Sequence, residues 1–167
     1  MRLPIEKRHV WEAYQAVRLN DGTHGADMED WVAFDRRRYH NLFRIWNRVS
    51  SGAYFPKPVR RVFLRQDDGG ERPLGIPCIR DRIVQEVLRG VLEPYLEPHF
   101  HDSSFAYRPG RNAHQGIAQC RTNTDYYSWC IDLDIRGYFD NIPHDKLMQA
   151  VVHFCPKLKW LHCYLWR

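Results

Sequence analysis

The chain has 167 residues, of which 44% are hydrophobic and 14% aromatic, and its formal net charge is +5. This composition excludes a disordered chain, and the length suffices for one hydrophobic core or for two small lobes. No apolar run is long enough to cross a bilayer, and the first residues, MRLPIEKRHVWEAYQ, lack the apolar stretch of a secretory signal. We therefore expect a cytoplasmic protein without membrane contact, whose five cysteines are reduced.

Helices are predicted for most of the first fifty residues. Apolar side chains recur at helical spacing over residues 8–19, and the loop-forming sequence NDGTHG follows. A second, longer helix is predicted from about Met28 to Val49, although the basic triplet RRR interrupts its apolar side. The sequence SSGAYFPKP ends this helix, because glycine and two prolines cannot continue it.

The middle of the chain predicts a β-hairpin, because VRRVFLRQ and ERPLGIP read as strands on either side of the turn DDGG. Helical spacing returns over residues 79–92 and again from Ala113 to Arg121, with the loop SSFAYRPGRN between them. A strand is predicted at 127–135. A helix that begins near Pro143 follows it, and the apolar tail KLKWLHCYLWR is also predicted to be helical.

The positive charge is concentrated in one segment. From Arg36 to Arg82 there are twelve lysines or arginines, eleven of them arginine, and only four acids, so this basic block carries +8. Arginine binds phosphate oxygens two at a time, and a localised basic block is typical of nucleic-acid-binding proteins. The aromatic residues interleaved with these charges are Trp46, Tyr54, Phe55 and Phe63. The alternative is a solvated charged helix face, which is common in proteins of other functions.

The strand predicted at 127–135 carries carboxylates inside an apolar frame. Side-chain alternation places Asp132 and Asp134 on one face, roughly 7 Å apart, while Trp129 and Ile131 lie on the other. Carboxylates this close indicate a bound cation, a basic ligand or good solvation. Oxygen ligands suit Mg²⁺, which usually takes one or two carboxylates plus substrate phosphates. The alternative is an exposed strand face whose acids have no chemical role.

Four segments in series resemble the reverse transcriptases that group II introns encode. The sequence DIRGYFDNIPH is similar to the first palm motif of that family, which has Asp, an aliphatic residue, two variable residues, two aromatics and Asp. RPLGIPCIRDRIVQ is similar to the fingers motif, LEPYLEPHFHDSSFAYRPGRNAH to the segment after it, and NRVSSGAYFPKPVRRV to the N-terminal extension. Order and spacing agree over nearly the whole chain, most firmly from about Leu42 to Leu147.

The resemblance implies roles for particular residues of the palm motif. Asp134 falls on the first catalytic aspartate of the family, with the carbonyl of Ile135 as a second metal ligand. Phe139 falls on the aromatic residue that screens the 2′ position of the sugar, where a bulky ring excludes a 2′-hydroxyl by steric clash. Asp132 and Asp140 are not metal ligands in the family, and we expect Asp140 to cap or brace the turn into the next helix.

The resemblance also assigns arginines. Arg72 falls where the family holds the incoming triphosphate. The family usually has a lysine just before the hairpin turn, whereas this chain has Gln66 and Asp67, so either Arg65 takes over that phosphate contact or the contact is lost. The candidate RNA contacts are Arg60 and Arg61 of the basic block, and Arg108 and Arg111 of the segment that in the family lies near template and nucleotide.

The expected fold is α+β: the fingers and a partial palm of a right-hand polymerase, mostly helical with a β-hairpin and an incomplete palm sheet. We expect an N-terminal extension with helical fingers at 1–57, the fingers hairpin and helices at 58–125, and the first palm strand with following helices at 126–167. The second metal-binding pair of the family belongs to a Tyr-x-Asp-Asp hairpin, which this sequence lacks. We therefore expect a fragment without the second half of the palm and the thumb, which binds RNA and does not polymerise.

By resemblance, the full-length protein is an RNA-directed DNA polymerase, a nucleotidyltransferase that uses two Mg²⁺ ions and also assists splicing of its intron RNA. Its partners would be intron RNA, an RNA template with a DNA primer, and deoxynucleoside triphosphates. Three alternatives stand beside this interpretation. They are a non-catalytic RNA-binding maturase or splicing factor, the reverse transcriptase of another bacterial retroelement, and a module that forms a homodimer through the apolar tail WLHCYLWR.

Overall fold

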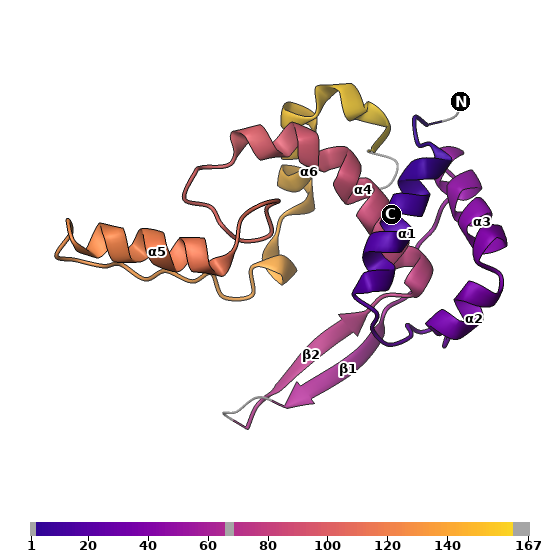
Figure 1. Cartoon of the computed structure of the whole chain (residues 1–167), viewed down its shortest axis with the longest axis horizontal. Helices are drawn as coiled ribbons and strands as arrows, with labels where there is room; N and C mark the ends of the chain where they lie inside the picture. The colour runs from indigo at the N-terminus through magenta and orange to yellow at the C-terminus, as the bar shows by residue number, and fades with distance from the viewer. Residues whose placement is uncertain (1–2, 66–68, 162–167) are drawn as a thin grey trace. The chain divides into compact units, whose positions relative to one another are not determined.

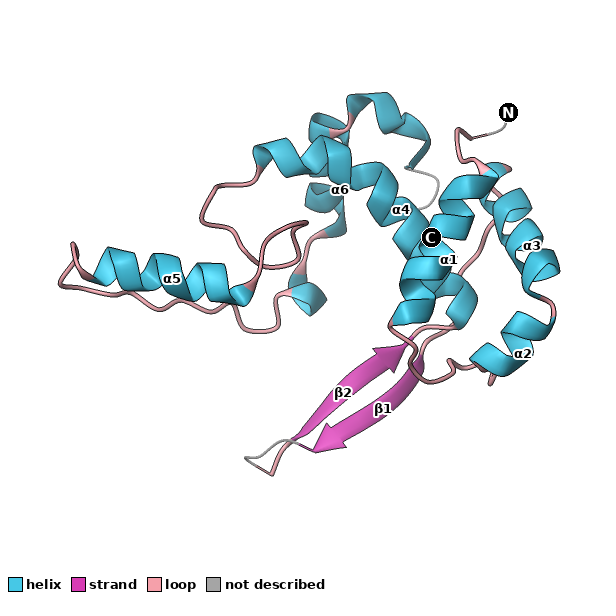
Figure 2. Ribbon diagram, viewed as in Figure 1, coloured by secondary structure: helices cyan, strands magenta, loops and turns pink. Residues whose placement is uncertain are grey.

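The computed structural model describes residues 3–65 and 69–161 (Figures 1 and 2). The α-helices are α1 (Lys7–Leu19), α2 (Trp31–Arg36), α3 (Arg38–Ser50), α4 (Ile79–Leu96), α5 (Ala113–Thr124) and α6 (His144–Phe154). The strands are β1 (Arg60–Arg65) and β2 (Glu71–Ile76), and the short 3-10 helices are η1 (Glu97–His99), η2 (Phe139–Asn141) and η3 (Pro156–Leu161). The predicted α+β class, mostly helical with one β-hairpin, is confirmed.

The chain forms two compact units, which are described separately. The first contains Met1–Leu92 with Leu158–Arg167, and the second contains Glu93–Lys157, so the boundary falls inside α4. The domain boundaries predicted after residues 57 and 125 were placed by sequence motifs, whereas these two units are defined by their internal contacts. The predicted boundaries therefore stay predictions.

The hydrophobic core of the first unit is built by α1, α2, α3 and the first half of α4. Phe34, Ile79 and Ile83 have no exposed surface, and Ile45 has 2%. Burial of such side chains stabilises a fold by about 1.5–3 kcal/mol each. The helix starts are capped: Glu6 and His9 form a capping box at α1, and a side-chain oxygen of Asp30 accepts a 2.7 Å hydrogen bond at α2.

The single helix predicted from Met28 to Val49 is wrong, because the structure has two helices separated at Arg37. The backbone of Arg37 is not helical, with φ −123° and ψ 31°. The side-chain amide of Asn41 donates a 2.9 Å hydrogen bond to the carbonyl of Phe34, which also accepts a 3.2 Å hydrogen bond from the backbone N–H of Arg37. The break is therefore stabilised by a side chain that helical periodicity does not single out.

The predicted hairpin is confirmed, with β1 and β2 antiparallel and Arg60 paired with Ile76 at its base. The helices predicted at 8–19, from Ala113 and after Pro143 are also confirmed, and α4 runs past its predicted end to Leu96. The predicted helical tail is described only to Leu161, as η3. In the described residues, no helix is both long and apolar enough to cross a membrane.

The strand predicted at 127–135 is wrong. This stretch has no regular secondary structure, and both faces of the expected strand are exposed: on one face Trp129 is 91% exposed and Leu133 87%, and on the other Asp132 and Asp134 are exposed. A strand persists only when neighbouring strands satisfy its backbone N–H and C=O groups. Among residues 3–65 and 69–161, β1 pairs only with β2, so 127–135 has no strand to pair with.

Candidate nucleic-acid interface

The hairpin presents arginines on both of its faces. Because paired residues share a face and successive residues alternate, the register fixes which side chains lie together. One face carries Arg60, Val62, Leu64, Arg72, Leu74 and Ile76. The other carries Arg61, Phe63, Arg65, Glu71, Pro73 and Gly75. Arg65 and Arg72, both predicted to hold the nucleotide triphosphate, therefore project to opposite sides of the ribbon.

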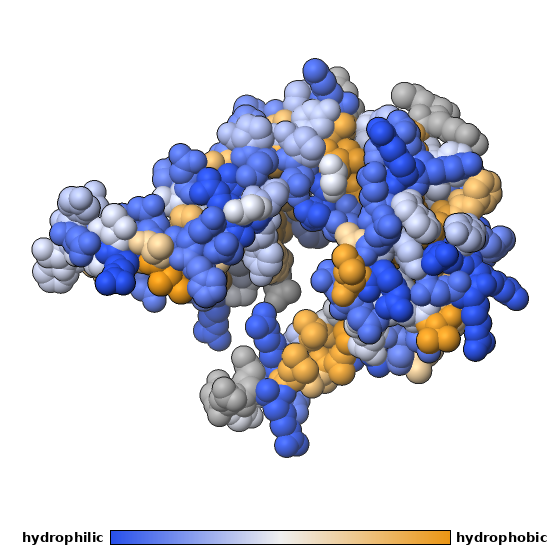
Figure 3. Space-filling model, viewed as in Figure 1, coloured by the Kyte–Doolittle hydropathy of each residue, from blue (hydrophilic) through white to orange (hydrophobic). Residues whose placement is uncertain are grey.

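Apolar side chains are exposed between these arginines. Phe63 is 58% exposed, Leu64 51% and Leu74 43%. Figure 3 shows the apolar surface gathered along the hairpin, with hydrophilic residues beside it. Gln66 and Asp67, where the family usually has a lysine, lie outside the described residues. The hairpin thus combines charged donors with apolar surface, which is a combination suited to sugar–phosphate and base contacts.

The side chain of Arg60 is held at the base of the hairpin by a hydrogen bond to the loop before α2. Its side chain is half-buried and donates a 3.1 Å hydrogen bond to the hydroxyl of Thr23. Arg82 binds the same loop through the carbonyls of Asp21 and Thr23, and it also donates to Pro77. Arg61, in contrast, is exposed and forms no ion pair with any described residue. Of the two, Arg61 is the more available to an RNA phosphate.

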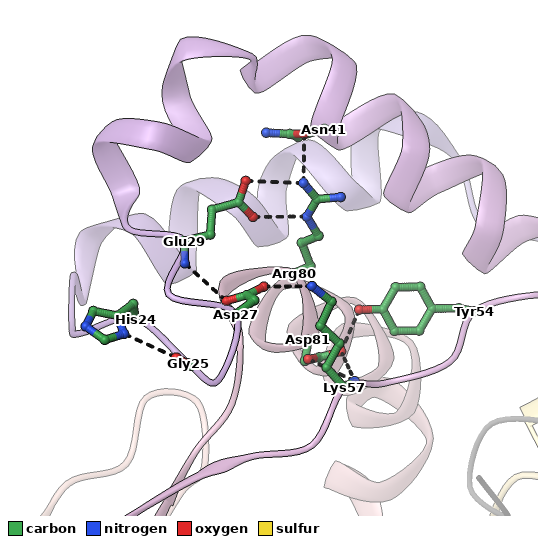
Figure 4. A network of polar contacts seen from close by, with 9 residues as sticks. All are labelled: His24, Gly25, Asp27, Glu29, Asn41, Tyr54, Lys57, Arg80 and Asp81. Carbon is green, nitrogen blue, oxygen red and sulfur yellow. Dashed lines mark hydrogen bonds and ion pairs between the residues drawn. The ribbon is translucent and has the colours of Figure 1, made fainter.

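A partly buried polar network surrounds the start of α4 (Figure 4). The guanidinium of Arg80 donates to both carboxylate oxygens of Glu29, at 3.1 and 3.2 Å, and to the side-chain oxygen of Asn41 at 3.1 Å. Asn41 is the residue that stabilises the break between α2 and α3. Arg80 therefore ties the start of α4 to the loop before α2 and to α3.

Asp81 is the acidic centre of the same network and is only 4% exposed. It accepts a 2.6 Å hydrogen bond from the hydroxyl of Tyr54 and longer ones, at 3.3 and 3.4 Å, from the backbone N–H of Lys57. Lys57 also forms a 3.2 Å ion pair with Asp27. These contacts join the segment that leads into β1 to the first turn of α4, where a carboxylate is also favoured by the helix dipole.

Burial and hydrogen bonding shift the ionisation of three groups here. Burial, together with the hydrogen bond to Asp81, raises the pKa of Tyr54 far above its ordinary value, so the phenol stays protonated and keeps donating. Burial also raises the pKa of the Cys78 thiol. Burial acts to raise the pKa of Asp27 as well, but hydrogen bonds from Lys57, Cys78 and the Glu29 backbone outweigh it, and the pKa is lowered.

The network removes several residues from the predicted RNA surface. Tyr54 was expected among the interleaved aromatics, but it is 7% exposed and serves Asp81. Lys57, Arg80 and Arg82 of the basic block are bound to acids or carbonyls. The sequence IRDR at residues 79–82 is a signal for such a network. Its alternating charges place two arginines and one aspartate around the first turn of a helix, where they can bind different neighbouring segments. Sequence reasoning did not use this signal.

Arg108 and Arg111 lie in the second unit, in the loop before α5. Arg108 has an 8% exposed side chain and donates to Glu97, at 2.8 and 3.0 Å, and to the carbonyls of His101 and Ser104. In this structure it organises the loop, so an RNA contact would require it to leave four hydrogen bonds. Arg111 is more accessible: it approaches Asp102 at 3.6 Å and lines a cavity of about 430 Å³ beside α5.

Asp134, Ile135 and Phe139 also lie in the second unit. Both Asp134 and Phe139 are exposed, Phe139 to 82%. Gly137 has a φ of +61°, and the amide of Asn141 donates a 2.8 Å hydrogen bond to its carbonyl, which closes the turn into η2. Asn141 therefore braces the turn, a role expected of Asp140, whose side chain lies outside the described structure. Among the described residues, no three His, Cys, Asp or Glu side chains are grouped as a metal site.

The sequence profile of the family described as reverse transcriptase (RNA-dependent DNA polymerase) matches residues 56–167. Because this match covers well over half of the chain, the chain belongs to the reverse transcriptase family. The profile begins just before the hairpin and includes the palm motif, in agreement with the resemblance of the motifs.

Similar proteins come from introns and from bacteria. An uncharacterised 91 kDa protein in the cob intron of Schizosaccharomyces pombe is 39% identical over 140 residues, which are 81% of this chain and 17% of that protein. Protein YkfC of Escherichia coli is 35% identical over 158 residues, 90% of this chain and 42% of that protein. The group II intron-encoded protein LtrA of Lactococcus lactis is 34% identical over 140 residues, 83% of this chain and 23% of that protein. The chain spans less than half the length of each of these relatives.

Proposed function

We propose that this chain is the RNA-binding fingers and first palm segment of a group II intron-encoded reverse transcriptase. The whole protein would copy RNA into DNA and assist splicing of its intron RNA. Its substrates would be an RNA template with a DNA primer and deoxynucleoside triphosphates. Family membership supports the polymerase, and the similarity to LtrA supports the intron origin. The observation that carries RNA binding is the exposed hairpin, whose Arg61, Arg65 and Arg72 form no ion pair with described residues.

The catalytic roles rest on the family motif. We assign the carboxylate of Asp134 and the carbonyl of Ile135 to a metal ion, Phe139 to the sugar of the nucleotide, and Arg72 to its triphosphate. Oxygen donors suit Mg²⁺, but two-ion phosphoryl transfer needs several carboxylates, and Asp134 has no grouped partner among the described residues. These residues alone do not fit a two-ion site.

One observation favours RNA binding without polymerisation for the 167-residue chain itself. The fingers half is folded around a buried core and a polar network, whereas the stretch that carries Asp134 has no strand partner. We expect RNA binding, and we expect no extension of a primer by this chain.

The test is fluorescence anisotropy with a single-stranded RNA between about 50 and 200 mM salt, a range in which phosphate contacts lose much of their affinity. Each phosphate contact contributes about −0.7 to the slope of log K against log salt for a single strand. The triple variant Arg61→Gln/Arg65→Gln/Arg72→Gln should therefore bind more weakly and with a slope shallower by about 2. The matched control is Arg121→Gln/Lys146→Gln/Lys157→Gln, which removes the same charge from exposed positions of the second unit. Equal changes in affinity and salt slope for the two variants would refute the assignment of the hairpin as the RNA-binding surface.

A further inference from the structure

Helix α3 carries two different stripes on its exposed side. Tyr39, Phe43 and Trp46 follow one another at spacings of four and three residues, so they lie along one face. His40, Arg44 and Arg48 follow at spacings of four on the adjoining face, and all three are exposed. The sequence of α3, RYHNLFRIWNRVS, contains no acid.

The aromatic stripe forms one wall of a cavity of about 270 Å³ between α1 and α3. Figure 1 shows these two helices side by side in the first unit. The cavity is lined by Lys7, Trp11, Tyr39, Leu42, Phe43 and Trp46. Its volume is just below the range of about 300–1,000 Å³ that is typical of drug-sized ligands, which suits a single flat ring system.

Cations already lie against these rings. The ammonium of Lys7 is 4.9 Å from the centre of the Trp46 ring and 5.6 Å from that of Phe43. The guanidinium of Arg38 lies 4.9 Å from the ring of Tyr39 and 5.6 Å from that of Trp11, and the rings of Trp11 and Tyr39 are stacked 6.3 Å apart. Rings flanked by positive charge favour a ligand that is both planar and anionic.

Little negative charge opposes such a ligand. Arg44 and Arg48 form no ion pair with any described residue. Of the two acids in and next to α1, Glu6 is paired with Arg8 at 3.0 Å, and only Glu12 is left beside Trp11. A lipid surface or a neutral protein helix would use the apolar wall but not the basic stripe. A nucleotide chain uses both, because its bases stack and its phosphates bind arginine.

We propose that the α1–α3 face is a second RNA site, at which an unpaired base enters the aromatic cavity and the flanking phosphates bind Arg44 and Arg48. The inference rests on the proposed RNA binding and adds a second binding site, which prefers unpaired bases. The base takes the position of the Lys7 ammonium over Phe43 and Trp46, and Lys7 moves to a phosphate. Duplex RNA, whose bases are already stacked, cannot fill the cavity.

The experiment measures binding of the 167-residue chain to two RNA probes of the same length and charge. One is an unstructured single strand, and the other is the same strand with abasic nucleotides at its centre. The variant Tyr39→Ala/Phe43→Ala removes two rings that are 71% and 51% exposed. The control Tyr126→Ala/Tyr127→Ala removes two rings that are 80% and 70% exposed and lie in the second unit. Phe43→Leu, which keeps an apolar side chain without a ring, serves if the double variant does not fold.

The expected result is a loss of about 5- to 100-fold in affinity for the intact strand, the range for removing stacked aromatics, with little change for the abasic strand. The control should leave both affinities unchanged. Equal losses on the two probes, or no loss on either, would overturn the proposal while leaving hairpin RNA binding intact. If Tyr39→Ala/Phe43→Ala changed the oligomeric state and left RNA affinity unchanged, the proposal would also be overturned, because the face would then be a protein interface. If the wild-type chain binds neither probe, this inference and the proposed function fail together.

Discussion

Removal of one hydroxyl group tests the polar network at the start of α4 (Figure 4). The change Tyr54→Phe keeps a ring that is 7% exposed but deletes the donor of the 2.6 Å hydrogen bond to Asp81. Asp81 would retain only the contacts of 3.3 and 3.4 Å from the Lys57 N–H. A hydrogen bond to a charged group contributes about 1.5–3 kcal/mol, and a buried carboxylate cannot recover the loss from water. We expect the free energy of unfolding to fall by about 2–3 kcal/mol.

Urea unfolding, followed by tryptophan fluorescence, measures this change from the midpoint and the slope. The matched control is Tyr107→Phe, which deletes the same hydroxyl from a fully exposed side chain and should change stability by less than about 0.5 kcal/mol. A double-mutant cycle with Asp81→Asn isolates the pair, and we expect a coupling energy above about 0.5 kcal/mol. A stabilising hydrogen bond between Tyr54 and Asp81 is refuted if Tyr54→Phe unfolds like the wild type and the effects of the two changes simply add.

Two further predictions concern the loop before α2. Gly25→Ala should destabilise the fold by about 1–3 kcal/mol in the same unfolding assay, because the added Cβ would lie 2.6 Å from the backbone N and Cα of Cys78. Gly90→Ala, whose Cβ meets nothing within 4 Å in α4, should instead be neutral or stabilising by about 0.5–1 kcal/mol; similar losses at the two sites would contradict the packing argument. The folded pKa of Asp27 lies below 3.8, so its stabilising effect is present above that pH and is lost as the pH falls through the folded value. The difference in stability between the Asp27→Asn variant and the wild type should therefore become smaller in acid. Urea midpoints of both proteins from pH 7 to pH 3 measure this difference. A difference that does not change with pH would be evidence against the ion pair of Asp27 with Lys57.

Local patterns sufficed where local physics decides the structure. The hairpin follows from alternating strands around a glycine-rich turn, and α1 follows from apolar residues at helical spacing before NDGTHG. These features depend on neighbours in the sequence, and the structure has them where the pattern predicts them.

Sequence patterns were insufficient where residues far apart in the chain decide the structure. The break at Arg37 depends on Asn41, which is itself oriented by Arg80 from α4. Periodicity alone cannot reveal such a partner. The same holds for the basic block: Arg80 and Arg82 look like RNA-binding residues in the sequence. Their partners are Glu29, 51 residues before Arg80, and the loop carbonyls of Asp21 and Thr23, 61 and 59 residues before Arg82. Net charge therefore overestimates the surface that is available to a polyanion.

The strand at 127–135 shows a third limit. Its alternation of apolar and acidic residues is typical of a strand, but a strand forms only when another strand pairs with it. No such partner exists among the described residues, so the pattern is present without the structure. The apolar side chains at Trp129, Ile131 and Leu133 are consequently exposed, at 91%, 82% and 87%.

The central claim is that the first unit of this chain binds RNA through the hairpin and α3. Ultraviolet crosslinking of the 167-residue chain to a 4-thiouridine-containing single strand, mapped by mass spectrometry, tests it directly. The account predicts crosslinks within β1, β2 and α3, among them Phe63 and Phe43. Crosslinks confined to residues 93–157, or none at a salt concentration where the RNA is bound, would contradict it.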